Sequence, residues 1–302
     1  MAVITERTAP QTITARDGRI GNIRRFLRRW PIASGGLFVV MVILAVFAPY
    51  IAPYEPTDFN LRESLEPPSL SHLLGTDGNG RDILSRLLYS GRVSLIVGAS
   101  AALLASLIGS TYGIAAGYFG GALGECLMRL ADLKLTLPSI MVALVAAATV
   151  GTGPIIWDIV PVNVILILGI LYSAHFARMT RGETLAIKGN DYVALAQVHG
   201  CSNLRIMIRH VFPNIRNTII VYISLIFAQS VLAESSFSFI GAGVPAETPT
   251  WGLMISQGRD YIATSWWIIT FPGVAILLTV MSVNLIGDWL RDRLDPRLRR
   301  RV

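Results

Sequence analysis

Long apolar stretches separated by polar, charged segments are the dominant pattern in this sequence. The hydrocarbon core of a bilayer is about 30 Å thick and requires roughly 20 apolar residues in a helix. Stretches of nearly this length predict membrane-spanning helices, whereas strands of a soluble sheet are shorter and alternate in polarity. We expect about six transmembrane helices, with five or seven left open because two windows are short. The windows are 34–51, 93–118, 135–152, 159–177, 218–233 and 265–286.

The composition supports an all-α membrane protein. Hydrophobic residues make up 53% of the 302 residues and charged residues only 15%, compared with about 25% charged residues in soluble domains. Cys126 and Cys201 are too few for a disulfide framework and lack zinc-ligand spacing. The window 34–51 is interpreted as a retained anchor, because it is longer than the apolar core of a signal peptide and no cleavage motif follows it cleanly.

Lys and Arg are concentrated in alternate segments between the windows. Of 26 such residues, 21 fall on one side of the predicted membrane, and the positive-inside rule assigns that side to the cytoplasm. Both termini are therefore predicted to be cytoplasmic, and the basic segments predict contact with membrane lipids rather than with nucleic acid. The expected divisions are a basic tail at 1–33, a first transmembrane helix at 34–51, an external segment at 52–92, a membrane core at 93–287 and a C-terminal tail at 288–302.

Small residues recur at every fourth position of the second window. This spacing places them on one face of a helix, where they allow another backbone to approach closely. The approaching helix belongs either to the same chain or to another subunit, and in both cases we expect the window to be buried in protein. The stripe consists of Ala101, Ala105, Gly109, Gly113 and Gly117.

The sequence lacks the residue patterns of a catalytic, cofactor or metal site. Its two lysines, Lys134 and Lys188, do not lie in a P-loop, and GTDGNGRD at 75–82 lacks the lysine that such a loop requires. The four histidines form no ligand pair at helical spacing. An enzymatic function is not expected, and any uphill transport must draw its energy from another protein.

Glu234 is the one charged residue whose place inside or outside the apolar windows is left open. Ionisable groups inside a membrane usually mark a path for a solute or an ion, and Ser235 and Ser238 make the surroundings of Glu234 more polar. One interpretation is a polar lining of a translocation path. The other is a helix end that reaches the outer headgroups.

The segment 82–93 has the pattern of an amphipathic helix. We expect it either to lie at the outer membrane interface or to form a dock or gate for an external protein. Its apolar face carries Ile83, Leu84, Leu87 and Leu88, and its polar face carries Asp82, Ser85 and Arg86.

The predicted cytoplasmic loop 178–217 is too long for a simple connector. Asn190 or Asp191 is the predicted cap of a short helix that runs to His199, and Ser202 or Asn203 is the predicted cap of a second helix at 204–212. Gly200 lies between the helices and Pro213 ends the second. A DNA-binding helix-turn-helix is disfavoured, because both ends are tethered to membrane spans and no third helix completes a core. The first helix has an apolar face that its own loop does not cover, which predicts a protein partner. That face consists of Tyr192, Val193, Leu195, Ala196 and His199.

The segment DYVALAQVHGCSNLRIMIRHVFPN at 191–214 resembles the EAA loop of ABC-importer permeases. The family pattern is Glu-Ala-Ala-x3-Gly-x9-Ile-x-Leu-Pro, and Ala196, Gly200 and Pro213 match it at the required spacing. Departures from the pattern are Ala194, where the family often has Glu, Leu195, where it has Ala, His210, where it has Ile, and Phe212, where it has Leu.

Three further blocks resemble the dipeptide/oligopeptide branch of the same permeases, in the same order. They are HLLGTDGNGRDILSRLLYSGRVSL at 72–95, SFSFIGAGVPAETPTWG at 236–252 and FPGVAILLTVMSVNLIGDWLRDRLDPRL at 271–298. The chain resembles the second inner-membrane permease subunit of peptide importers over nearly its whole length.

This resemblance implies a type I ABC-importer permease fold in a bacterial inner membrane, with 178–217 as the coupling loop. It also implies a homologous second permease subunit, two ABC ATPases that bind ATP and Mg, an extracytoplasmic substrate-binding protein and a peptide substrate. The residues implied to contact the ATPase are Asp191, Tyr192, Ala194, Leu195, Ala196, Gly200 and Pro213. Alternatives are an importer of the same class that carries nickel, glutathione or another small solute, an ion-coupled secondary transporter, and a membrane scaffold or receptor.

Overall fold

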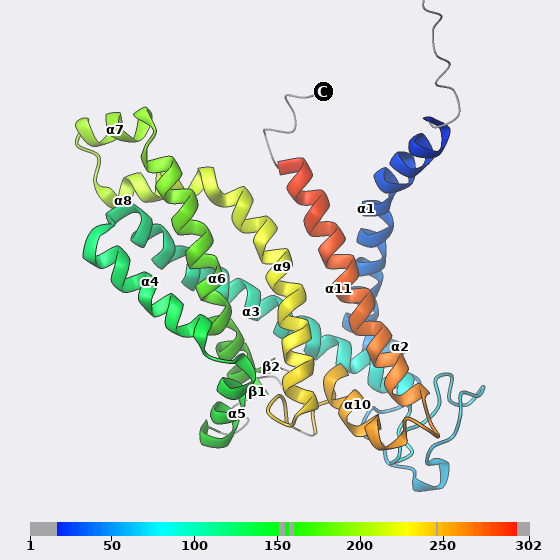
Figure 1. Ribbon diagram of the computed structural model, residues 1–302. Helices are drawn as coiled ribbons and strands as arrows, with labels where there is room; N and C mark the ends of the chain where they lie inside the picture. The colour runs from blue at the N-terminus through cyan, green and yellow to red at the C-terminus, as the bar shows by residue number, and fades with distance from the viewer. Residues whose placement is uncertain (1–16, 151–154, 157–159, 246, 295–302) are drawn as a thin grey trace, which may run out of the picture.

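The computed structural model describes residues 17–150, 155–156, 160–245 and 247–294, and these residues form an almost entirely helical chain (Figure 1). The terminal parts of both predicted tails, 1–16 and 295–302, lie outside the described residues. The long helices are α1 (Asp17–Val46), α3 (Ile83–Phe119), α4 (Gly121–Thr136), α5 (Ser139–Val150), α6 (Val162–Lys188), α9 (Phe212–Phe239) and α11 (Trp267–Leu294). The shorter elements are α2 (Ala48–Ile51), η1 (Leu61–Glu63), α7 (Asp191–Val198), α8 (Asn203–Ile206), η2 (Met207–Val211), α10 (Trp251–Gly258), η3 (Arg259–Tyr261) and a small hairpin of β1 (Ile155–Ile156) and β2 (Val160–Pro161).

Each of the six apolar windows overlaps a helix, with 151–152 and 159 lying outside the described residues, but not all of these helices are continuous spans. Within the described residues, four helices are long and apolar enough to cross a membrane: α3, α6, the continuous helix Asn203–Phe239 and α11. A fifth span results if α4 and α5 are counted together, although the two are bent by 86° at Leu137–Pro138. The apolar part of α1, Ile32–Val46, is shorter. The all-α membrane fold is confirmed.

Several predicted boundaries are wrong, and two have a clear local cause. The first window breaks after Val46, and α2 then starts with Pro49 in its first turn, where the missing N–H of proline is tolerated. Pro213 likewise does not end the second loop helix; it lies in the first turn of α9. The π-helical turn η2 precedes it, and Phe212 N–H bonds to Met207 O, so the chain continues from α8 into the membrane without a break.

The other corrections extend helices beyond their apolar windows. The segment 119–134, predicted as a loop, is mostly helix α4, and Gly120 alone separates it from α3. Helix α6 continues to Lys188, well into the predicted loop. Helix α3 begins at Ile83, so 82–93 is not a separate interfacial helix but the first turns of this long helix. A dock or gate for an external protein at these turns stays a prediction. Polar residues at helix ends hide these extensions from a hydropathy window.

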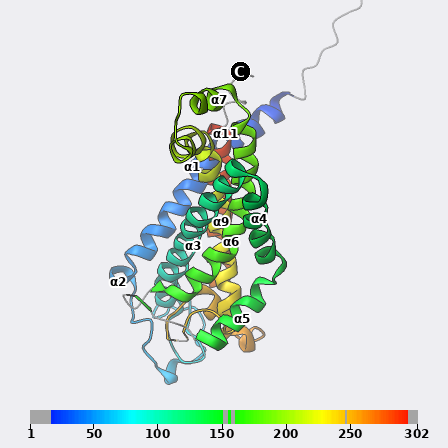
Figure 2. The same ribbon diagram turned by 90° about the vertical axis from the view of Figure 1, so that its left-hand side faces the viewer.

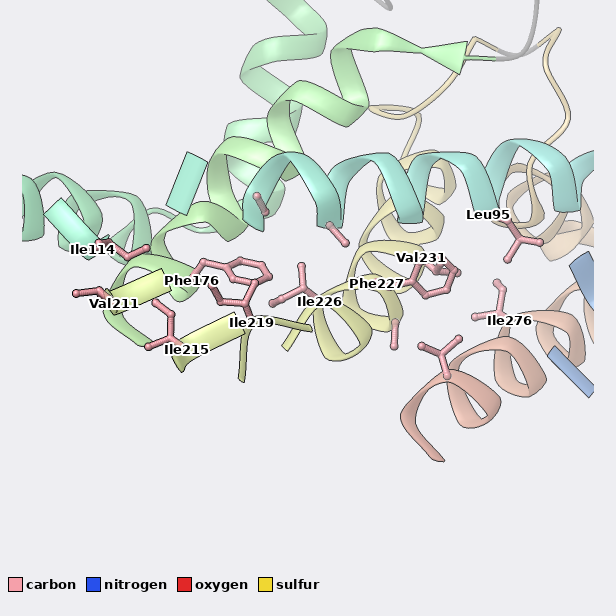
Figure 3. Packing of buried hydrophobic residues seen from close by; sticks show 14 of the residues in the cluster. Leu95, Ile114, Phe176, Val211, Ile215, Ile219, Ile226, Phe227, Val231 and Ile276 are labelled. Carbon is pink, nitrogen blue, oxygen red and sulfur yellow. The ribbon is translucent and has the colours of Figure 1, made fainter. Parts of the chain in front are cut away.

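Helix α3 is the centre of the fold. Its most apolar stretch is 61% buried within the chain, compared with 39% for α6, α8–α9 and α11. Figure 3 shows the core that lies along it, from Phe176 of α6 through Ile226 and Phe227 of α9 to Ile276 of α11. Figure 2 shows α3, α4, α6 and α9 running side by side, with α1 at the flank.

The two ends of the molecule are formed by different elements. Helices α7 and α8, the start of α1 and the end of α11 all lie at one end (Figure 1). The loop 52–82, α5 and α10 lie at the other end. The chain therefore carries two separate terminal structures, one on each side of its long helices.

Candidate functional site

The segment after α6 forms a compact helix–turn–helix at one end of the molecule. Gly200 has φ +74°, in the left-handed region that L side chains rarely adopt. Its N–H donates to Gln197 O and the N–H of Cys201 donates to Ala196 O, both over 3.0 Å. These two bonds form a Schellman motif, which ends α7 and reverses the chain. The role of Gly200 within the chain is thus conformational, since a Cβ there would meet no atom within 4 Å.

The two caps predicted for the loop helices behave differently. Ser202 accepts a 3.4 Å hydrogen bond from the N–H of Arg205 and caps α8. Asn190 occupies the N-cap position of α7 with extended backbone, but its side chain makes no capping bond. The loop therefore has a side-chain cap on its second helix and a glycine turn between the helices.

The apolar face predicted for α7 is only half uncovered. Val193 is 1% exposed and packs with Ile206 and Val211 in the core of the same chain, and Ala196 contacts that core. Leu195, in contrast, is 56% exposed. The prediction that the loop 178–217 does not cover this face is wrong for its inner half, because Ile206 and Val211 of the same loop pack with Val193.

Four exposed aliphatic side chains define what we call the apolar end surface. Leu195 and Val198 lie on α7, Leu204 on α8 and Ile208 on η2, with exposed fractions of 56%, 82%, 63% and 58%. Sequence reasoning named only Leu195 of this set, although the spacing of 195 and 198 is helical. Asp191, Tyr192, Ala194 and His199 are also on the outside of this segment, whereas Pro213 lies in the first turn of α9.

Glu234 lies in a buried cluster between α9 and α3. It is 0% exposed, and its two carboxylate oxygens accept hydrogen bonds from Ser94 Oγ over 3.0 Å and from Ser238 Oγ over 2.7 Å. Helix α9 ends five residues later, at Phe239, so Glu234 lies near the helix end but is enclosed by protein, and its place relative to the headgroups stays a prediction. Ser235 is 7% exposed beside it, under Gly252 of α10.

The stripe of small residues on α3 faces α6 of the same chain. Ala101 and Ala105 are fully buried. A Cβ on Gly113 would lie 2.5 Å from Ala177 O, one on Gly117 would lie 2.8 Å from Thr184 Cβ, and one on Gly109 would lie 2.6 Å from Phe176 Cβ. The glycines therefore set the distance between the two backbones.

A buried charged cluster fixes the loop 52–82 to the helices, and sequence reasoning missed it. Asp77 accepts hydrogen bonds from Arg81 Nε over 2.8 Å and from Arg86 Nη1. Gln257 of α10 accepts from both guanidinium groups, over 3.0 Å and 2.8 Å. The sequence signal for this cluster was the nearby Asp and Arg in GTDGNGRD at 75–82, a segment that sequence analysis considered only as a phosphate-binding loop.

His72 forms a second polar contact in the same loop. Its Nδ1 lies 3.0 Å from Asp82 Oδ1 and its Nε2 lies 3.4 Å from Glu63 Oε2, while its ring stacks on Tyr54. Burial disfavours the charged imidazolium, but the hydrogen bonds to Asp82 and Glu63 and the attraction of both carboxylates outweigh it and raise the pKa of His72. The imidazolium is the form that donates to both carboxylates at once.

A cavity of about 640 Å³ opens between α6, α9 and α11. Its lining includes Glu183, Asn217, Tyr222, Asp288 and Arg291, but none of Glu234, Ser235 and Ser238. In the part of the chain that the structure describes, no group of three or more His, Cys, Asp or Glu side chains is arranged to hold a metal ion.

Comparison with known proteins identifies the family. Residues 22–68 match the N-terminal transmembrane domain of oligopeptide transport permease C. The chain is 41% identical to the dipeptide transport system permease protein DppC of Escherichia coli K12 over 281 residues, 91% of each chain. It is 38% identical to the di/tripeptide transport system permease protein DppC of Pseudomonas aeruginosa, covering 88% of each chain. It is 37% identical to the glutathione transport system permease protein GsiD of Pectobacterium atrosepticum, covering 91% of this chain and 90% of the relative.

Residues 109–300 match the family described as the inner membrane component of binding-protein-dependent transport systems. This match contains α6 to α11, including the whole of the apolar end surface. The chain belongs to this family of binding-protein-dependent transport system inner membrane components.

Proposed function

We propose that this chain is a transmembrane permease subunit of an ATP-driven importer for dipeptides or oligopeptides. The observation that carries the proposal is the apolar end surface, held on a compact helix–turn–helix in a chain related to peptide permeases over about nine-tenths of its length. Exposed apolar patches mark sites of contact with a protein or a membrane, and we propose that this one contacts a protein. No cofactor is needed in this chain, since ATP and Mg are bound by the partner.

The proposed partner at the apolar end surface is a cytoplasmic ABC ATPase. Leu195 and Val198 enter a groove on the ATPase, and Asp191, Tyr192, Ala194 and Ala196 flank this contact or support it. The full assembly contains a homologous second permease subunit, two ATPases and an extracytoplasmic substrate-binding protein. Both termini then face the cytoplasm with α7, and the loop 52–82 faces outward.

The proposed mechanism is alternating access by rigid-body movement. Closure of the two ATPases on ATP moves the coupling helices together, and the close contact of α3 with α6 carries that movement through the membrane as one body. Hydrolysis restores the first arrangement. This chain transmits force and forms no covalent bond with the substrate.

A translocation-path role for Glu234, Ser235 and Ser238 requires the helices around them to separate. Glu234 has no exposed surface in this structure, so we propose that these residues meet the path only when α3 and α9 move apart. A Ser238→Cys variant tests this role. We expect a membrane-impermeant thiol reagent to modify it only in the presence of ATP and loaded binding protein, and equal modification without ATP contradicts the role.

Uptake into proteoliposomes tests the substrate. We expect the purified assembly to import a labelled dipeptide only when ATP, the ATPases and the binding protein are all present. Uptake of glutathione or nickel in place of the peptide assigns a different cargo to the same importer class. Uptake that continues without the ATPases, driven by an ion gradient, contradicts the proposal and favours a secondary transporter.

A further inference from the structure

Tyr118 lies where the C-terminal end of α3 meets the helix–turn–helix of the apolar end surface. It is 3% exposed and belongs to the same buried cluster as Val193 of α7 and Ile206 of α8. Gly120 ends α3 two residues later with φ +64°. The tyrosine is therefore the last buried side chain of the central helix, directly beneath the segment that carries Leu195 and Val198.

The polar atoms of Tyr118 are bonded to three different elements. Its hydroxyl donates to Asn203 Oδ1 of α8 over 3.0 Å and accepts from Gln197 Nε2 of α7 over 3.3 Å. Its backbone carbonyl accepts from Lys188 Nζ at the end of α6 over 2.7 Å. The Lys188 ammonium also lies 5.6 Å from the centroid of the Tyr118 ring, within range of a cation–π attraction.

These contacts connect α7 to the membrane helices in a way that the linkers alone do not. Residues 189–190 join α6 to α7, and residues 199–202 join α7 to α8. The covalent path allows α7 to tilt about both linkers, because apolar contacts such as those of Val193 are not directional. Hydrogen bonds fix direction, and the Tyr118 hydroxyl is bonded to α7 and α8 at the same time.

We infer that Tyr118 is a positioning residue that transmits force between the central helix α3 and the coupling segment 191–203. The inference rests on the proposed function, because it takes α7 as the helix that contacts the ATPase. The α3–α6 contact at Gly109, Gly113 and Gly117 makes two helices into one body, and Tyr118 attaches α7 and α8 to that body. Without the hydroxyl, the ATPase moves α7 but part of this movement is lost in the linkers.

Tyr118→Phe in the complete importer tests the inference, with Tyr89→Phe as the matched control. The first change removes only the hydroxyl and keeps the ring, and Tyr89 lies near the other end of the same helix. The readouts are peptide imported per ATP hydrolysed and hydrogen exchange of residues 191–203. We expect Tyr118→Phe to retain the ATPases, to lower the ratio severalfold and to speed exchange, while Tyr89→Phe changes neither.

A double-mutant cycle makes the role specific. Asn203→Ala alone is expected to lower the same ratio, and the double variant is expected to lose less than the sum of the two single changes, because both changes break the bond between Tyr118 and Asn203. Tyr118→Phe also removes the bond from Gln197, so it is expected to be the more severe single change. A ratio in Tyr118→Phe equal to that of the wild-type importer, or fully additive effects in the cycle, would overturn the inference.

Val198→Asp in the same importer separates this inference from the proposed function. If Val198→Asp releases the ATPases while Tyr118→Phe leaves the ratio unchanged, α7 is the coupling helix and Tyr118 does not position it. If Val198→Asp leaves the ATPases bound and coupled, the proposed function of α7 fails, and the inference fails with it.

Discussion

Ser94 of α3 donates a 3.0 Å hydrogen bond to the carboxylate of Glu234 on α9, and both residues are fully buried. The two positions are 140 residues apart in the sequence. A buried carboxylate is stable only where donors surround it, and Ser238 supplies a second one. This bond therefore anchors α9 to the central helix within the apolar part of the fold.

Glu234→Ala is expected to destabilise the assembled importer and Glu234→Gln to be milder. Alanine leaves the hydroxyls of Ser94 and Ser238 without their acceptor, which costs about 1–3 kcal/mol for each buried group left unsatisfied. Glutamine retains an acceptor oxygen at nearly the same position. Thermal unfolding in detergent measures both variants, and equal midpoints for wild type and Glu234→Ala contradict this account of the cluster.

Gly113→Ala is expected to lower stability because α6 leaves no room for a methyl group. The added Cβ would lie 2.5 Å from Ala177 O, and overpacking of this kind costs typically 1–3 kcal/mol. Gly182→Ala is the matched control, since a Cβ there meets nothing within 4 Å. The folded yield after detergent extraction and the unfolding midpoint should fall for Gly113→Ala and not for Gly182→Ala.

Gly200→Val is expected to disturb the turn between α7 and α8. A β-branched residue at φ +74° is a strong outlier, and a left-handed L residue costs roughly 1–2 kcal/mol. Gly189→Val changes an exposed glycine outside that region of φ. We expect ATPase retention and peptide uptake to fall for Gly200→Val, and equal loss in both variants would argue against a conformational role.

The His72 contact predicts a pH dependence of stability in the loop 52–82. The ordinary pKa of 6.5 is raised in the folded chain, so the stabilisation is complete below about pH 6.5 and is lost as pH rises through the raised value. The wild type should therefore unfold at a higher midpoint than His72→Gln at about pH 6, and this difference should decrease as the pH is raised to about 9. A difference that grows with pH would contradict this sign.

The sequence was sufficient to predict the membrane class and the turn between the two short helices at 191–198 and 203–206. Apolar length predicted where the long helices lie, and Gly200 and Ser202 predicted the turn and the second cap because both effects are local. Hydropathy did not predict where helices end, because the polar first or last turns of a helix fall outside an apolar window. In the sequence, Arg86 and Ser85 resemble the solvent-exposed face of an interfacial helix. In the structure both side chains are buried, because Asp77 accepts from Arg86 and Asp82 accepts from Ser85.

The parts that sequence reasoning missed depend on contacts between distant segments. The coverage of Val193 by Ile206 and Val211 requires the loop to fold back over the continuous helix from Asn203. The bonds from Tyr118 to Gln197 and Asn203 join residues about eighty positions apart. No local pattern around Tyr118 distinguishes it from an aromatic residue at a membrane interface.

Recovery of this chain from its native membrane in gentle detergent tests the central claim most directly, with the eluate assayed for ATP hydrolysis. Wild type is predicted to bring with it a second permease subunit and P-loop ATPases that hydrolyse ATP. Val198→Asp should lose the ATPases, whereas Leu70→Asp, which alters a side chain 98% exposed in the loop at the other end of the molecule, should keep them. A wild-type chain that elutes alone from several detergents, with no ATP hydrolysis, would contradict the account.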